Sequence, residues 1–207
     1  MTNKEVLAPT ERWKQLVEEF ISFGGTADNV IQQEGEFGLG LFPIDPAKPA
    51  ELHVPDRLLV ATDNLVLRDG NIVLKDASCY PPGFEDWYQR FQADYSWGAE
   101  AQDSIRSFEE GLKSLPERAQ KLLRNLGIAN IESRYSEANK EQDIFDRFIA
   151  TRRINRHDQT WLMPMIELVN HSPRKPSWGM NDHGITVKGT FDGEILVRYS
   201  VADPLRR

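Results

Sequence analysis

The sequence predicts an α+β domain, because segments typical of strands stand at both ends of the chain and segments typical of helices fill its middle. Glycine-punctuated apolar runs dominate up to about residue 76, helical spacing of apolar residues follows, and strand-like runs return after residue 160. Strands grouped apart from helices favour an α+β arrangement over alternating βα units. We therefore expect one domain with a helical insertion, divided into residues 1–76, 77–150 and 151–207.

The first predicted helix covers residues 10–23. Thr10 is a candidate N-cap, and Gly24-Gly25 supply a stop signal. Its apolar residues repeat at the spacing of one helical face: Trp13, Leu16, Val17, Phe20 and Ile21. This face is expected to pack against the core.

Several short strands are predicted on either side of the helical block. "FGLGLFPI" and "RLLVA" indicate strands, and "LVLRDGNIVLK" indicates a hairpin that turns at Asp69-Gly70. "ITVKGTFDGEILVRYS" indicates a second hairpin that turns near Asp192-Gly193. These segments together predict small antiparallel sheets.

Four further helical segments are predicted between these strands. Trp87 and Phe91 stand four residues apart, residues 114–126 form a helix that ends at Gly127, and Ser136 caps the last one. The inward residues of the last three are Ile105, Phe108, Leu112 and Leu115, then Leu122, Leu123 and Leu126, then Ile144, Phe145, Phe148 and Ile149. The last helix carries "ATRR" on its final turn.

Composition excludes several classes of function. A net charge of -7 argues against nucleic acid as the main ligand, although it suits a basic peptide. The single cysteine, Cys79, allows no disulfide within the chain and excludes a cysteine-built zinc site, and it is expected to be structural. No long apolar run or signal-peptide core is present, so we expect a soluble, cytoplasmic protein with no membrane partner. The four histidines form no ligand pattern, so we expect no metal.

Gly38-Leu39-Gly40 lets the backbone approach another group closely, because neither glycine has a Cβ. The stretch lacks the third glycine of a dinucleotide fingerprint and the lysine of a P-loop. Read alone, it indicates either a bent strand or a backbone that lies against a ligand.

Two other stretches carry polar groups that suit ligand binding. In "ATRRINR" the arginines either lie in solvent at a helix end or clamp a carboxylate. In "LMPMIELVNHS" a buried segment ends in Asn170-His171, which either ties a loop or holds a ligand with several polar edges. No Gly-x-Ser-x-Gly elbow indicates a serine hydrolase.

In chain order these stretches resemble the SET-domain protein-lysine methyltransferases, in particular the Rubisco large-subunit methyltransferase-like subgroup with a helical insertion. Gly40 and Asn170 are 130 residues apart, and the helices between them account for a spacing that is long for a bare SET core. The matching residues are Gly38, Gly40 and Leu41, then Thr151-Arg152, then Pro164, Met165, Glu167 and Asn170-His171-Ser172. The resemblance implies a SET-like fold of small curved β-sheets with a knot-like C-terminal crossing and an inserted helical subdomain.

The resemblance also implies a reaction. S-adenosylmethionine would be the methyl donor, and the acceptor would be an exposed lysine of a protein substrate. Gly38, Leu39 and Gly40 would lie against the cofactor, and Arg152, or its neighbour Arg153, would pair with the cofactor carboxylate or orient the strand that does. Asn170 would bond the amino-acid end, and the backbone of His171 would read the adenine edge.

The sequence departs from this family in three places. Glu167 stands where the family more often has Asp, and Pro173 stands where many histone-directed members have a zinc-binding Cys. The family's catalytic tyrosine follows a strand that matches "EILVRYSVADPLRR", and the chain stops at Arg207. Tyr199 does not match it, so no catalytic residue is assigned. We expect either a truncated chain with little turnover or a degenerate module that binds a basic peptide or the cofactor without turnover; chance motif matches in an unrelated α+β domain are the third reading.

Overall fold

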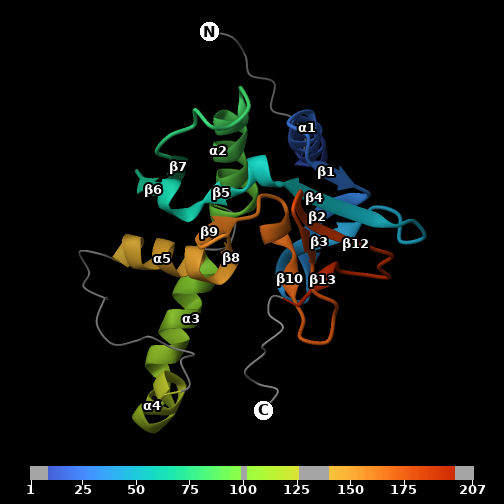
Figure 1. Cartoon of the computed structure of the whole chain (residues 1–207). Coiled ribbons are helices and arrows are strands. Elements are labelled where there is room, and N and C mark those ends of the chain that lie inside the picture. Colours follow the sequence, from blue (N-terminus) through green and yellow to red (C-terminus); the bar gives the residue numbers. More distant parts are fainter. Residues whose placement is uncertain (1–8, 99–101, 126–139, 199–207) are drawn as a thin grey trace.

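The computed structural model describes residues 9–98, 102–125 and 140–198 as a mixture of helices and short strands (Figure 1). The helices are α1 (Pro9–Ser22), α2 (Phe84–Tyr95), α3 (Gln102–Ser114), α4 (Glu117–Asn125) and α5 (Lys140–Arg152). The strands of the first half are β1 (Thr26–Asp28), β2 (Val30–Gly35), β3 (Gly38–Pro43), β4 (Ala50–Pro55), β5 (Val60–Ala61), β6 (Leu65–Arg68) and β7 (Asn71–Leu74). Those of the second half are β8 (Ile154–Arg156), β9 (Gln159–Leu162), β10 (Asn170–His171), β11 (Gly179–Asn181), β12 (Gly184–Gly189) and β13 (Leu196–Val197).

Within the described residues the strands form five small sheets, which confirms the predicted α+β class. The largest has the order β1-β4-β12-β11, and its centre is a six-residue antiparallel pairing of β4 with β12. The others pair β2 with β3, β5 with β9 and β8, β6 with β7, and β10 with β13. Figure 1 shows β1, β4 and β12 on the side of the molecule opposite α3, α4 and α5.

Helix α1 buries the face that its spacing predicts. The indole Nε1 of Trp13 donates to the Val30 carbonyl at 3.0 Å, and Phe20 stacks on Trp87 of α2 with ring centroids 5.3 Å apart. Two details differ from the prediction. The helix already includes Pro9, which suits a first turn, so Thr10 lies inside it and is not its cap. Ile21 is 47% exposed because it lies at the edge of the apolar face.

The hairpin of β6 and β7 turns at Asp69-Gly70, as predicted. Both residues have positive φ, 50° and 76°, and two consecutive residues of this kind match the right-handed twist of the strands.

The helical middle of the chain divides into a buried and an exposed part. α2 and α5 bury their predicted inner faces, including Trp87, Phe91 and Phe148. α3 and α4 project away from the sheets in Figure 1, and among their predicted inner residues whose side chains the structure describes, only Leu112 is buried. Leu115 and Leu122 are exposed, contrary to prediction, because the described residues provide no layer for that face to pack on. Leu126, Gly127, Ser136 and the side chains of Ile105 and Phe108 lie outside the described residues.

Two strand predictions are wrong in part. "RLLVA" forms a 3₁₀ turn, η1 (Asp56–Leu58), followed by the two-residue strand β5. The hairpin predicted for residues 185–200 does not form, because its two halves join different sheets: β12 pairs with β4 and β11, whereas β13 pairs with β10 in parallel. Ile185 and Val187 are buried on β12, and the backbone N–H of Ile195 donates to the Leu41 carbonyl of β3 at 2.7 Å. The two halves of the predicted hairpin therefore make their contacts with other strands and not with each other.

The segment from Leu162 to Val169 is buried at every position. It ends β9 and continues through a 3₁₀ turn, η5 (Ile166–Leu168). Met165, directly before this turn, has φ 70° and ψ −48°, which is uncommon for a residue with a side chain and costs on the order of 1–3 kcal/mol. The surrounding contacts must therefore hold the segment in place.

Candidate functional site

The structure brings the glycine-rich strand and the Asn-His stretch together. Asn170, the first residue of β10, donates from Nδ2 to the Leu39 carbonyl of β3 at 3.2 Å, across 131 residues of chain. Its Nδ2 also donates to Oε1 of Glu194 at 2.6 Å. We call Leu39, Asn170 and Glu194 the outer cluster; all three side chains are partly exposed.

Gly40 allows the close approach that its sequence context predicts. A Cβ at this position would lie 2.2 Å from Oε1 of Glu194 and 2.8 Å from Nδ2 of Asn170, which is closer than real Cβ atoms come to a neighbour. Gly38, the first residue of β3, has φ 86° and also needs the freedom of glycine. The groups that fill the space beside Gly40 are side chains of the protein itself.

Glu194 was missed by the sequence analysis. It lies just before β13 in a segment that was read as half of a hairpin, and a lone acidic residue after an Asp-Gly turn gives no sign of a site. Only the parallel pairing of β13 with β10 brings this carboxylate to Asn170. A carboxylate two residues before the register partner of an asparagine in a parallel pair has no local sequence pattern.

Backbone contacts fix this corner on two sides. Asn170 is the register partner of Leu196, and His171 is the partner of Val197. The backbone N–H of Ser172 donates to the Val197 carbonyl at 2.9 Å. His171 is exposed, so its backbone and ring lie where a bound molecule could reach them.

The described contacts of Arg152 lie on its own helix. Its guanidinium lies 4.3 Å from the ring centroid of Phe148, and Nη1 donates to Oγ1 of Thr151 at 3.1 Å. Its charge also lowers the pKa of Glu167, so it faces η5 electrostatically. Figure 1 shows α5 apart from β3 and β10, and the neighbouring Arg153 is exposed.

An arginine–carboxylate pair forms within "ATRRINR" on Arg156, with one hydrogen bond and not the two of a clamp. Arg156 is 8% exposed, and its Nη2 donates to Oδ2 of Asp56 at 2.7 Å. This pair ties β8 to the turn η1. The sequence analysis named the chemistry of this stretch and placed it on Arg152 or Arg153.

A second polar group lies three residues before Asn170, inside the core. Oε1 of Glu167 accepts hydrogen bonds from Nε2 of Gln92 at 2.8 Å and from Oγ of Ser96 at 2.7 Å. We call Gln92, Ser96 and Glu167 the inner cluster; none is more than 6% exposed. Burial raises the pKa of the Glu167 carboxyl above its ordinary value, although the hydrogen bonds from Ser96 and Gln92 and the charge of Arg152 oppose this rise.

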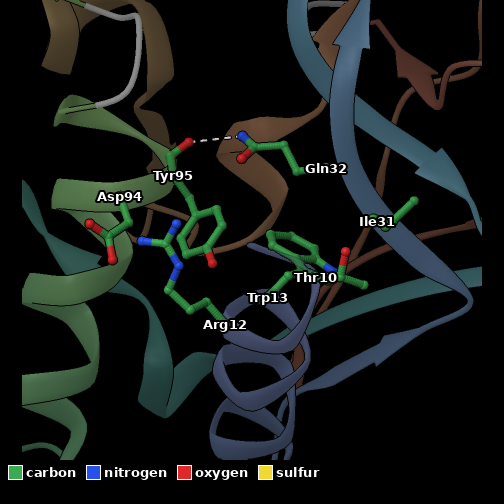
Figure 2. A pocket seen from close by; sticks show the side chains of 7 residues that line it. All are labelled: Thr10, Arg12, Trp13, Ile31, Gln32, Asp94 and Tyr95. Carbon is green, nitrogen blue, oxygen red and sulfur yellow. Dashed lines mark hydrogen bonds between the residues drawn. The ribbon is translucent and has the colours of Figure 1, made fainter. Parts of the chain in front are cut away.

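A cavity of about 300 Å³ opens between α1, β2 and α2 (Figure 2). Its aromatic wall is Trp13 against Tyr95, edge to face with centroids 5.2 Å apart, and Gln32 donates to the Tyr95 carbonyl at 2.9 Å. Burial raises the pKa of the Tyr95 hydroxyl. The full lining is Thr10, Arg12, Trp13, Ile31, Gln32, Asp94 and Tyr95, which includes none of the predicted site residues.

Other kinds of site have no counterpart in the part of the chain that the structure describes. Residues 9–98, 102–125 and 140–198 contain no group of three or more His, Cys, Asp or Glu side chains that could hold a metal ion. No helix among those residues has both the length and the apolar character needed to cross a membrane. Cys79 is exposed in the turn before α2.

Comparison with known proteins gives one distant likeness. No protein-family model matches the chain, and no curated protein matches it. Among solved structures, the chain is similar to the SET domain of LSMT bound to lysine and AdoHcy, with a TM-score of 0.45 and 13% identity. The match covers 94% of this chain and 55% of that one, so the chain spans about half the length of that protein. At this score and identity the likeness is too weak to assign a fold or an activity.

Proposed function

We propose that the chain is a SET-like scaffold that binds S-adenosylmethionine and serves methyl transfer to a protein lysine. One observation supports this above the rest: Asn170 of "VNHS" donates to the Leu39 carbonyl inside "GLG". The motif resemblance requires these two stretches to meet, and they are separated by 131 residues. Chance matches of two short motifs would meet in space only by coincidence.

The outer cluster suits one end of the proposed cofactor. The amino-acid end of S-adenosylmethionine carries an ammonium and a carboxylate, and Leu39 and Glu194 present oxygens close to Asn170. A carbonyl and a carboxylate suit an ammonium, and an Asn170 N–H would suit the ligand carboxylate once it leaves Leu39 or Glu194, to which both N–H groups now donate. In this proposal Arg152 pairs with the ligand carboxylate or orients the strand that does, and the backbone of His171 meets the adenine.

In the proposed reaction the protein itself forms no covalent bond. The bound cofactor supplies a methyl group on a sulfonium sulfur, and the lysine amine must lose its proton before its nitrogen can accept that methyl. The protein's part is to align the two groups and to favour the neutral amine in a partly apolar channel.

The finer features belong to the same proposal. They are the Rubisco methyltransferase-like subgroup, the helical insertion of residues 77–150, a knot-like C-terminal crossing and a cytoplasmic location. The parallel pairing of β10 with β13, next to the bond from Ile195 to Leu41, supports a crossing of segments at this corner.

Calorimetric titration with S-adenosylmethionine and with its demethylated product tests the proposal. The wild-type chain should bind both, and Asn170→Ala should lose binding while its circular dichroism stays unchanged. Asn71→Ala is the matched control. Like Asn170, Asn71 donates a side-chain hydrogen bond to a backbone carbonyl, and it is an exposed residue of the β6–β7 hairpin. No binding at hundreds of micromolar by a folded wild-type sample would sink the cofactor claim.

The net charge of -7 favours a second candidate, a module that holds a basic peptide without turnover. Fluorescence anisotropy with a lysine-rich peptide separates the two functions. Peptide binding that persists in Asn170→Ala, without any cofactor binding by the wild type, would support the module and overturn the methyltransferase.

A further inference from the structure

Glu167 stands out because the proposed function does not use its side chain, although the carboxyl is buried and joins two distant parts of the chain. Its partners Gln92 and Ser96 belong to α2 and its C-terminal end, 75 and 71 residues away. Carboxyl groups are rarely this buried unless they are paired with other groups. Burying the Glu167 carboxyl costs free energy, so a structural reason must explain its position.

The backbone around Glu167 gives that reason. Met165, two residues earlier, has the uncommon φ of 70°, and η5 is a single turn whose cap has no side-chain hydrogen bond. The backbone N–H of Glu167 donates to the Met163 carbonyl at 2.9 Å. A turn this short has little hydrogen bonding of its own, so side-chain contacts must fix its orientation. Asn170 follows this turn after one residue, Val169.

We infer that Glu167 is a positioning residue: by binding Gln92 and Ser96 it locks η5 to α2 and thereby sets where Asn170 and His171 stand. The role of the locked residues rests on the proposed function, whereas the lock itself does not. The helices before residue 100 would then control the geometry of a site whose residues lie after residue 160.

Three buried oxygens have no hydrogen-bond partner within this group: Oε2 of Glu167, Oε1 of Gln92 and the hydroxyl of Tyr88. Burial and the nearby Glu167 carboxylate both raise the pKa of the Tyr88 hydroxyl, so the two residues lie close enough to interact. A protonated Glu167 would carry a donor on Oε2 and no charge. Protonation therefore removes the charge from a buried carboxyl whose Oε2 accepts no hydrogen bond in the structure.

Few other charges face this carboxyl. Arg152 reaches it from α5, and Tyr88 faces it from α2. η5 also packs on β3, which has no charged side chain, and on β4, whose Glu51 and His53 bond to Lys188 and Thr186 of β12. Arg152 is thus the main opposing charge.

The sign of the pH dependence follows from the raised pKa. The folded chain keeps the Glu167 proton to a higher pH than the unfolded chain does, so the stabilisation is complete below the ordinary carboxyl pKa. It is lost as the pH rises from that value through the folded one. Glu167→Gln resembles the protonated carboxyl and should not show this loss.

Nuclear magnetic resonance of the Asn170 side-chain amide tests the positioning role without any cofactor. In the wild type its signals should move with pH as Glu167 ionises, and in Glu167→Gln that component should vanish. Glu194 lies beside Asn170 in both proteins, so its contribution cancels in the difference. Glu18→Gln, an exposed residue of α1, is the control and should behave as wild type.

Two further variants measure the loss of position. Ser96→Ala removes one of the two bonds with little change of shape and should shift the Asn170 signals, whereas Glu167→Ala should shift them more or fail to fold. Identical pH curves in wild type and Glu167→Gln, together with unshifted Asn170 signals in Ser96→Ala, would overturn the inference.

The same variants separate this inference from the proposed function. If the proposed function holds, Ser96→Ala weakens S-adenosylmethionine binding at least several-fold and Glu167→Gln retains it. Asn170 signals that respond to Glu167 in a protein that binds no cofactor would overturn the proposed function and leave the positioning role standing.

Discussion

The inner and outer clusters lie three residues apart on one segment and differ in almost everything but polarity. The inner cluster is buried and ties Glu167 to helix α2. The outer cluster is partly exposed and ties Asn170 to strand β3 and to Glu194. Both use one polar side chain of the segment to reach residues far away in the sequence.

The comparison teaches that burial decides what a polar side chain can do. A buried group that loses its partner cannot turn to water, so its bonds serve structure above all. A partly exposed group can exchange its partner for water or for a ligand at little cost. By this criterion Asn170 is suited to bind a ligand and Glu167 is suited to hold the binding residue.

The largest expected effect is a loss in the free energy of unfolding when the inner cluster loses a hydrogen bond. Gln92→Leu leaves the buried Glu167 with one bond in place of two and should lower the free energy of unfolding by about 2 kcal/mol. Urea denaturation followed by circular dichroism measures it. Gln142→Leu is the matched control on α5, because Gln142 is exposed and donates to Asp146 of its own helix.

The control should change the stability by no more than a few tenths of a kcal/mol. Equal losses in the two glutamine variants would contradict the distinction between a buried and an exposed polar bond. The control also guards against a general effect of placing leucine on a helix.

The next effect tests the outer cluster. Gly40→Ala puts a methyl group where Oε1 of Glu194 and Nδ2 of Asn170 now lie. Both atoms are ends of flexible side chains, so we expect them to move and lose their mutual bond, at about 1 kcal/mol. The same substitution should cost clearly less in a Glu194→Ala background, where the nearest obstacle is gone.

A thermal-melt cycle of the four proteins measures this coupling. Gly193→Ala is the control, since a Cβ there meets nothing within 4 Å. If Gly40→Ala costs as much without Glu194 as with it, the backbone of β3 and not the outer cluster demands the glycine.

The sequence predicted the elements of the fold that follow a local pattern. Periodicity located α1, α2 and α5, and the Asp69-Gly70 signal located its hairpin, because these depend on neighbours in the chain. Leu39, Gly40 and Asn170 belong to stretches that the residues themselves singled out and that the family resemblance joined, and these residues meet in space. Their binding role stays a prediction.

The rest depended on contacts between distant segments. The pairing of β13 with β10 replaced a predicted hairpin and brought Glu194 to Asn170. In the sequence Glu167 appeared only as a departure from a motif, because no neighbouring residue indicates that its carboxyl bonds to Gln92 and Ser96. A buried polar bond across more than 70 residues leaves no periodic signal.

The smallest expected effect concerns Arg152, which was predicted for the cofactor and contributes its charge to the inner cluster. Arg152→Met keeps an unbranched side chain over Phe148 and removes the charge that lowers the pKa of Glu167. The pKa of Glu167 should rise further, so the loss of stability with rising pH should extend to higher pH. Since Arg152 is partly exposed, the difference from wild type should be only a few tenths of a kcal/mol.

Urea midpoints across the pH range measure this difference, with Arg153→Met, at an exposed arginine, as the control. The pH-dependent part should disappear when Glu167→Gln is added, because Arg152 then has no Glu167 carboxylate to act on. A pH-dependent difference that persists in that background would show that Arg152 acts on another group.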